Sequence, residues 1–124
     1  MASGTEPKYA SGEDSGWLYY TNSDYFSGTI YYRKIGNIVC MRAIGISLVS
    51  AITKNTGVSI GTIPSGYAPS GDSCAVAVTS RLLDFPFHIT LYPDPNRYIY
   101  VTANKSYDVP ASTAFSFSIM YFSD

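Results

Sequence analysis

Short segments in which apolar and polar residues alternate, separated by Gly, Pro, Asn and Asp, recur along this chain of 124 residues. Successive side chains of a strand point to opposite faces of a sheet, so a period of two is typical of strands with one buried face. The pattern predicts one all-β domain, a sandwich or a barrel. We expect strands in eight segments: 17–20, 29–34, 37–45, 58–62, 74–81, 86–92, 98–103 and 114–122.

Three segments without clear alternation have plain structural interpretations. The stretch 44–52, IGISLVSAI, comes closest to a helical period, but Gly45 and its β-branched residues disfavour a helix. The tripeptide IGN at 35–37 is typical of a tight hairpin turn. Because PSGYAPSGDS at 64–73 is too rich in Pro and Gly for a strand, we expect a long ordered loop there.

The segment FHITLYPDPNRYIYVTA at 87–103 predicts an antiparallel hairpin with a defined register. Residues directly opposite each other in such a pair point to the same face. Leu91 must therefore pair with Ile99 if the buried face is to stay apolar, and 93–97 becomes a five-residue loop. The other face then carries the histidine of the chain and three tyrosines: His88, Tyr92, Tyr98 and Tyr100.

This aromatic face has three explanations, which the residues alone leave open. It packs beneath another element of the domain, meets an identical face in an oligomer, or forms a stacking platform for the CH-rich face of a sugar ring. Composition bears on the choice, because 14% of residues are charged, 15% are aromatic and mean hydropathy is +0.04. A small domain with so few charges has apolar surface to cover, which favours association of identical chains.

The last alternating segment, AFSFSIMYF at 114–122, places phenylalanines on one face and two serines, Ser116 and Ser118, on the other. Small outward side chains permit a neighbouring surface to approach closely. We therefore expect Ser116 and Ser118 at the contact between protomers, together with Tyr98 and Tyr100 of the hairpin.

Charge and hydropathy exclude two classes of partner. The formal net charge is −1 without any basic run, so we expect no nucleic-acid binding. No stretch of about 18 apolar residues is present, so we expect no membrane insertion. Residues 1–16 are rich in Ser, Gly, Glu and Asp, which is typical of a flexible lead-in before a domain at 17–124.

The inventory of reactive residues is small. Cys40 and Cys74 are interpreted as two reduced, buried thiols, with a disulfide as the alternative. One histidine and two distant cysteines do not make a zinc site, so we expect no metal and no cofactor. A Ser-His-Asp arrangement would have to use His88 and Asp84 without a G-x-S-x-G turn. The other aspartates adjoin turn-forming residues, and we predict no catalytic residue and no enzyme.

Two segments carry a resemblance to a known family. They are YYRKIGNIVCMRAIGIS at 31–47 and VSIGTIPSGYAPSGDS at 58–73, the second with an Ile-Pro-x-Gly-Tyr-x-Pro-Ser core. With the hairpin at 86–103, they make residues 17–124 resemble the C-terminal head module of tail-fibre and receptor-binding proteins of bacteriophages and prophages. Many members have a basic residue where this chain has Ala68.

The resemblance implies an antiparallel β-sandwich of the jelly-roll or Greek-key type, at the tip of a virion tail and made in the cytoplasm of the bacterial host. Such heads bind a saccharide or protein of the bacterial surface as homotrimers and contact other tail or baseplate proteins. The expected function is recognition of a surface saccharide without catalysis. Polar loop residues would pair with sugar hydroxyls beside stacking aromatic rings, and the candidates are Asp94, Asn96, Arg97, Arg81, Asp84, Tyr92 and His88.

Three other functions stay open at this level. A purely structural tail or baseplate component would meet other virion proteins on its surfaces. A carbohydrate-binding module of an enzyme would be monomeric in solution, whereas the head requires a trimer. A glycan hydrolase would need two carboxylates facing one cleft.

Overall fold

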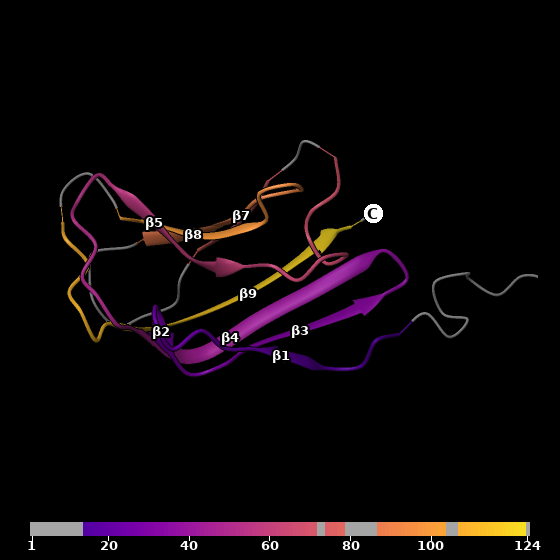
Figure 1. Ribbon diagram of the computed structural model, residues 1–124, viewed down its shortest axis with the longest axis horizontal. Helices are drawn as coiled ribbons and strands as arrows, with labels where there is room; N and C mark the ends of the chain where they lie inside the picture. Colours follow the sequence, from indigo (N-terminus) through magenta and orange to yellow (C-terminus); the bar gives the residue numbers. More distant parts are fainter. Residues whose placement is uncertain (1–13, 72–73, 79–86, 104–106, 124) are drawn as a thin grey trace, which may run out of the picture.

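The computed structural model describes residues 14–71, 74–78, 87–103 and 107–123 (Figure 1). Within these residues the chain forms nine strands and no helix, and all strand pairs are antiparallel. The predicted all-β class is therefore confirmed. The larger sheet contains β1 (Leu18–Tyr20), β2 (Phe26–Ser27), β3 (Ile30–Ile35), β4 (Ile38–Leu48) and β9 (Ala114–Phe122). The smaller sheet contains β5 (Gly57–Thr62), β6 (Ala75–Val78), β7 (Phe87–Leu91) and β8 (Tyr98–Ala103).

Strand β4 is the centre of the larger sheet. It pairs along one edge with β9 and along the other with β3 and then β2, while β1 lies outside β3. Ile35 pairs with Ile38, so Gly36 (φ +60°) and Asn37 form the expected tight turn. A bulge at Gly45 (φ +65°) interrupts the pairing of β4 with β9, which explains why the sequence around it departs from strict alternation.

The smaller sheet has the strand order β5-β8-β7-β6. Its central hairpin has the predicted register, because Leu91 pairs with Ile99 and Thr90 with Tyr100. The loop 93–97 is closed by a hydrogen bond of 2.9 Å from the N–H of its last residue to the carbonyl of its first. The apolar requirement on the buried face was thus sufficient to fix both register and loop length.

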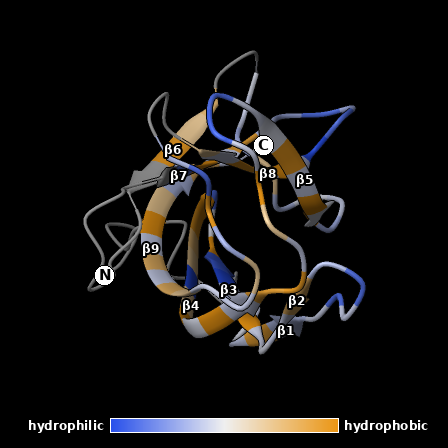
Figure 2. Cartoon of the chain, turned by 90° about the vertical axis from the view of Figure 1, so that its left-hand side faces the viewer, coloured by the Kyte–Doolittle hydropathy of each residue, from blue (hydrophilic) through white to orange (hydrophobic). Residues whose placement is uncertain are grey.

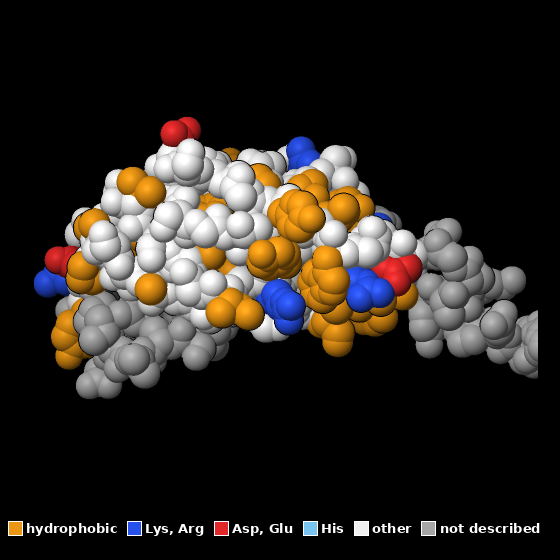
Figure 3. All heavy atoms as spheres, turned by 90° about the horizontal axis from the view of Figure 1, so that it is seen from below, with side chains coloured by type: hydrophobic (Ala, Val, Ile, Leu, Met, Phe, Trp, Pro, Cys, Tyr) orange, Lys and Arg blue, Asp and Glu red, His pale blue; other side chains and the backbone are white. Residues whose placement is uncertain are grey.

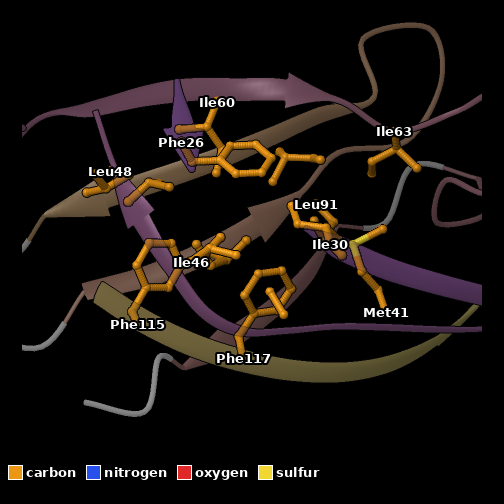
Figure 4. Packing of buried hydrophobic residues seen from close by; sticks show 14 of the residues in the cluster. Phe26, Ile30, Met41, Ile46, Leu48, Ile60, Ile63, Leu91, Phe115 and Phe117 are labelled. Carbon is orange, nitrogen blue, oxygen red and sulfur yellow. The ribbon is translucent and has the colours of Figure 1, made fainter. Parts of the chain in front are cut away.

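The two sheets pack face to face as layers, and their inward side chains form one core (Figures 1 and 4). Hydropathy alternates along β4 and β9 in Figure 2, as expected for strands with one buried face. Phe115 and Phe117 of β9 stack with ring centroids 6.4 Å apart. The most deeply buried side chains come from both layers: Phe26, Ile30, Met41, Ile46, Ile60, Ile89, Leu91, Ile99, Val101 and Phe115.

The loop after β5 closes one end of the sandwich. Tyr67 of this loop packs edge-on against Tyr32 of β3 with ring centroids 4.9 Å apart. The hydroxyl of Tyr121 donates a hydrogen bond of 2.6 Å to the Tyr67 carbonyl, and burial raises the pKa of Tyr121. The Lys34 amine donates to the Gly66 carbonyl at 2.8 Å. The described part of the expected ordered loop is therefore held by the core, and Ala68 within it is buried.

Several elements differ from the expected ones; β4, for example, continues to Leu48 and not to residue 45. Strand β2 was not expected, because two residues are too short to show a period. The lead-in was expected to be flexible through residue 16, but Ser15 donates its N–H to the Lys34 carbonyl at 2.9 Å, so 14–16 lie against β3. Strand β6 ends at Val78, and the rest of the expected strand 74–81 lies outside the described residues.

The two cysteines are free thiols, as expected, but neither is buried. Cys40 lies between the buried residues Val39 and Met41 on β4, so its side chain points outward and is half-buried. Cys74 precedes β6 and is exposed. The prediction of buried thiols was therefore wrong, because the outward parity of Cys40, shared with the charged Arg42, outweighs the general tendency of cysteine toward burial.

Candidate functional site

The outer face of the smaller sheet carries the tyrosines that the sequence placed together. Tyr92, Tyr98 and Tyr100, which we call the tyrosine cluster, have ring centroids 5.6, 5.8 and 6.5 Å apart. Two of the three contacts are edge-to-face, the geometry that the ring quadrupole favours. Tyr98 keeps 39% of its surface exposed. The cluster therefore forms a supported aromatic surface that is open to solvent.

Gly57 of the edge strand β5 makes room for this surface. A Cβ at this position would lie 3.1 Å from Cζ of the Tyr100 ring, and still nearer to Cε2, so the ring occupies the space that a side chain would fill. Cross-strand neighbours of the cluster carry hydroxyl groups: Ser59 and Thr90 pair with Tyr100, and Thr62 pairs with Tyr98. The face thus combines aromatic rings with a row of hydroxyls.

His88 lies on the same outer face, one same-face pair along the ladder from Tyr100. It pairs with Thr102 on β8, and its side chain is half-buried. Thr90 separates it along β7 from Tyr92, with which it was predicted to act. The structure therefore brings His88 to the predicted face, two residues along the strand from the aromatic rings.

Arg97, predicted to bind a ligand from the hairpin tip, is held by the protein. One guanidinium N–H donates to the Ile63 carbonyl at 3.1 Å, and Nε lies 3.2 Å from the Asp94 carboxylate. Its backbone carbonyl accepts from the Ile63 N–H at 2.8 Å. Arg97 therefore ties the hairpin tip to the end of β5, whereas Asp94 and Asn96 are exposed at the tip. Arg81 and Asp84 lie outside the described residues.

The four residues predicted at the protomer contact fall on opposite sides of the sandwich. Tyr98 and Tyr100 lie on the outer face of the smaller sheet, and Ser116 and Ser118 on that of the larger sheet. Ser116 also accepts a hydrogen bond of 2.9 Å from the N–H of Gly45 at the bulge. The structure therefore does not bring these four residues together on one surface.

The outer face of the larger sheet, which we call the apolar face, is the more hydrophobic of the two. Figure 3 shows this side, with hydrophobic side chains gathered around Lys and Arg side chains toward one end. Arg42 and Arg33 lie over the ring of Trp17, 4.9 and 5.8 Å from its centroid. Several large hydrophobic side chains are more than 60% exposed here: Tyr19 (72%), Ile44 (72%), Met120 (66%) and Phe122 (64%).

A recess of about 340 Å³ lies where β5 faces the loops around β2 and the end of β4. Its lining includes Asp24 and Tyr25 on one side, the turn residues Thr53 and Thr56 on another, and buried Ile60 beneath. Sequence reasoning missed this site because its walls come from three separate segments. It had assigned Asp24 to turn chemistry, and the residue does lie in a turn.

Metal-ligand groups and membrane-spanning helices were both sought among the described residues. Within them, no three His, Cys, Asp or Glu side chains are grouped so that they could hold a metal ion. No helix that could cross a lipid bilayer occurs in the described part of the chain.

No protein-family model and no curated protein sequence matches this chain. Interpretation of the site therefore depends on its geometry.

Proposed function

We propose that this protein is a non-enzymatic adhesion head, a homotrimeric sandwich of the jelly-roll or Greek-key kind that recognises a saccharide of the bacterial surface from the tip of a phage tail. The observation that carries the proposal is the tyrosine cluster, because three mutually supported rings stand at the surface beside a row of hydroxyls. The flat CH-rich face of a sugar ring matches an aromatic surface, and hydroxyl groups match the edge of the sugar.

In this proposal one outer face binds the saccharide and the other forms the contact between protomers. Each contact of a closed trimer joins two different patches of neighbouring copies, and the ring closes when both patches face a common three-fold axis, so we place both patches on one outer face. The apolar face suits this contact, because Met120, Phe122 and Ile44 have no polar group to hydrate. Of its two arginines, Arg33 is paired with the Asp14 carboxylate, which offsets its charge, and Arg42 lies over the Trp17 ring. Ser116 and Ser118 then stay at the protomer contact, while Tyr98 and Tyr100 are left to the saccharide.

Assembly is tested by light scattering on matched variants. We expect a mass of about 40 kDa, three times the 13.5 kDa of one chain. Met120→Asp should give the monomer, because it places a charge on the apolar face. Val76→Asp is the matched control, since Val76 is 57% exposed on the smaller sheet and should leave the trimer intact. A wild-type monomer would contradict the head proposal and favour a carbohydrate-binding module.

Recognition is tested by binding to arrays of bacterial surface polysaccharides and to whole cells. Tyr98→Ala should weaken binding at least about tenfold, equal to ~1.4 kcal/mol. Tyr107→Ala, at another exposed tyrosine outside the cluster, should not. A protein that forms trimers but binds no cell or polysaccharide would be a structural tail or baseplate component.

A further inference from the structure

We infer that the recess beside β5 is a second binding subsite, which takes one pyranose ring of a neutral or amino sugar and rejects acidic sugars. The inference deepens the proposed function and depends on it. The volume of about 340 Å³ is at the lower end of the range of small-molecule sites, ~300–1,000 Å³, which suits a single sugar ring better than a larger ligand.

The walls of the recess have the chemistry that a sugar ring requires. Its floor is apolar, because Leu48, Ile52 and Ile60 are at least 96% buried. Tyr25 adds an aromatic side chain that is 44% exposed. The rim carries the exposed carboxylate of Asp24. An apolar floor, an aromatic wall and a polar rim match the two kinds of surface on a pyranose.

Polar groups at the rim are free to bind. Within the described part of the chain, neither Asp24 nor the hydroxyls of Ser50 and Thr53 take part in a hydrogen bond or ion pair. A carboxylate can accept hydrogen bonds from two adjacent sugar hydroxyls, and such charge-assisted bonds are shorter and stronger than neutral ones. The same carboxylate repels an acidic sugar, because a cation that could offset its charge is not among the lining residues.

The walls are held in place before any ligand arrives. The N–H groups of Tyr25 and of the next residue both donate to the Asn22 carbonyl at 3.0 Å, and the Tyr25 carbonyl accepts from the Val49 N–H at 2.9 Å. On the opposite wall, the N–H of Lys54 donates to the Asp108 carboxylate at 2.7 Å. Little ordering is then needed on binding, which favours affinity.

Strand β5 separates the recess from the tyrosine cluster. Gly57 lines the recess, and the Tyr100 ring of the cluster covers the same glycine from the outer face. A branched or bent oligosaccharide that crosses the edge of β5 could therefore occupy both sites. Two linked sites raise the affinity for such a ligand beyond that of either site alone.

The test uses the full chain and amide chemical shifts by NMR, with glucose, galactose, N-acetylglucosamine, glucosamine and glucuronic acid as probes at tens of millimolar. We expect at least one neutral or amino sugar to shift the amides of 24–25 and 50–57 in a saturable way. Glucuronic acid should bind these amides at least about tenfold more weakly. Asp24→Asn should weaken the bound sugar about fivefold or more and reduce the discrimination against glucuronic acid. Asp14→Asn is the matched control, because Asp14 pairs with Arg33 away from the recess.

The outcomes separate this inference from the proposed function. Sugar-induced shifts confined to the tyrosine cluster, lost in Tyr98→Ala and retained in Asp24→Asn, would overturn the recess as a subsite and leave saccharide recognition standing. Equal binding of glucuronic acid and neutral sugars at 50–57 would also overturn it. A failure of polysaccharide arrays, cells and all five sugars to bind would overturn both.

Discussion

Tyr20 of β1 contacts Gly61 of β5, where edge strands of the two sheets meet. Substitution of this pair tests the packing between the sheets quantitatively. The Tyr20 hydroxyl accepts hydrogen bonds from the Thr62 N–H at 3.2 Å and from the Asn22 amide at 3.1 Å. In Gly61→Ala, the new Cβ would lie 2.7 Å from Cε2 and 2.9 Å from Cζ of Tyr20, and nearest of all to its hydroxyl oxygen. The ring has to move, and both hydrogen bonds are broken as it does.

The cost follows from these contacts. Overpacking of this kind costs about 1–3 kcal/mol, and each lost hydrogen bond costs about 1 kcal/mol. Alanine also lowers the conformational entropy of the unfolded chain, which stabilises the folded state by ~0.4–1 kcal/mol. We therefore expect Gly61→Ala to lower the free energy of unfolding by about 2–4.5 kcal/mol. Tyr20→Phe should lower it by about 1–2 kcal/mol, because it removes the same two hydrogen bonds.

Urea unfolding followed by circular dichroism, at one fixed protein concentration, measures these values. The double variant Gly61→Ala/Tyr20→Phe should be more stable than the sum of the two single losses predicts, by about 1–2 kcal/mol. Each single variant loses the same two hydrogen bonds, which the double variant loses only once. Tyr20→Phe also removes the hydroxyl oxygen, which is the atom nearest to the new Cβ. Gly57→Ala with Tyr20→Phe is the control, because Gly57 is covered by Tyr100 instead, and it should be additive within ~0.5 kcal/mol. Additivity of Gly61→Ala with Tyr20→Phe would refute the contact.

Tyr121→Phe removes a hydroxyl that donates to a loop carbonyl, so we expect a loss of about 1–2 kcal/mol in the same urea assay, and an unchanged midpoint would contradict the bond. The hydrogen bond from Arg33 lowers the pKa of Asp14 to about 2. Since this folded-state pKa is below the unfolded one, its stabilisation is present above about pH 4 and is lost toward pH 2. The Tm of the wild type should therefore fall more than that of Asp14→Asn across this range in low salt. Both thiols should react with Ellman's reagent without reductant, Cys74 before Cys40, and a protein with no free thiol would contradict the structure.

The strand positions and the register of the hairpin could be predicted because both depend on local patterns. Alternation marks which residues of a strand are buried, and only the pairing of Leu91 with Ile99 keeps the hairpin's apolar residues on one face. The outward position of Cys40 was also readable, since Arg42 shares its parity. General burial tendencies of a residue type are weaker information than the parity of the strand that carries it.

The features that sequence reasoning missed depend on which segments meet in space. Arg97 is held by Ile63, which is distant in the sequence, so nothing local marked it as structural. The recess needs the turn at Asp24, the end of β4 and the edge of β5 at the same time. The separation of Ser116 from Tyr98 depends on how the strands divide between two sheets, and alternation within a strand does not show that division.

The outer faces of the two sheets carry few charges, and they differ in how well their exposed side chains are hydrated. On the smaller sheet, tyrosine and threonine hydroxyls can hydrate, so that face can stay in water while its rings remain available to a ligand. On the larger sheet, Met120 and Phe122 have no polar group, and burial of each side chain by another surface would stabilise the protein. Burial of a Phe or Met side chain is worth about 1.5–3 kcal/mol, so a few such residues from each copy offset much of the entropy lost in association. If copies of this chain associate, the difference in hydration thus assigns assembly to the larger sheet and leaves the tyrosines of the smaller sheet exposed in the assembled protein.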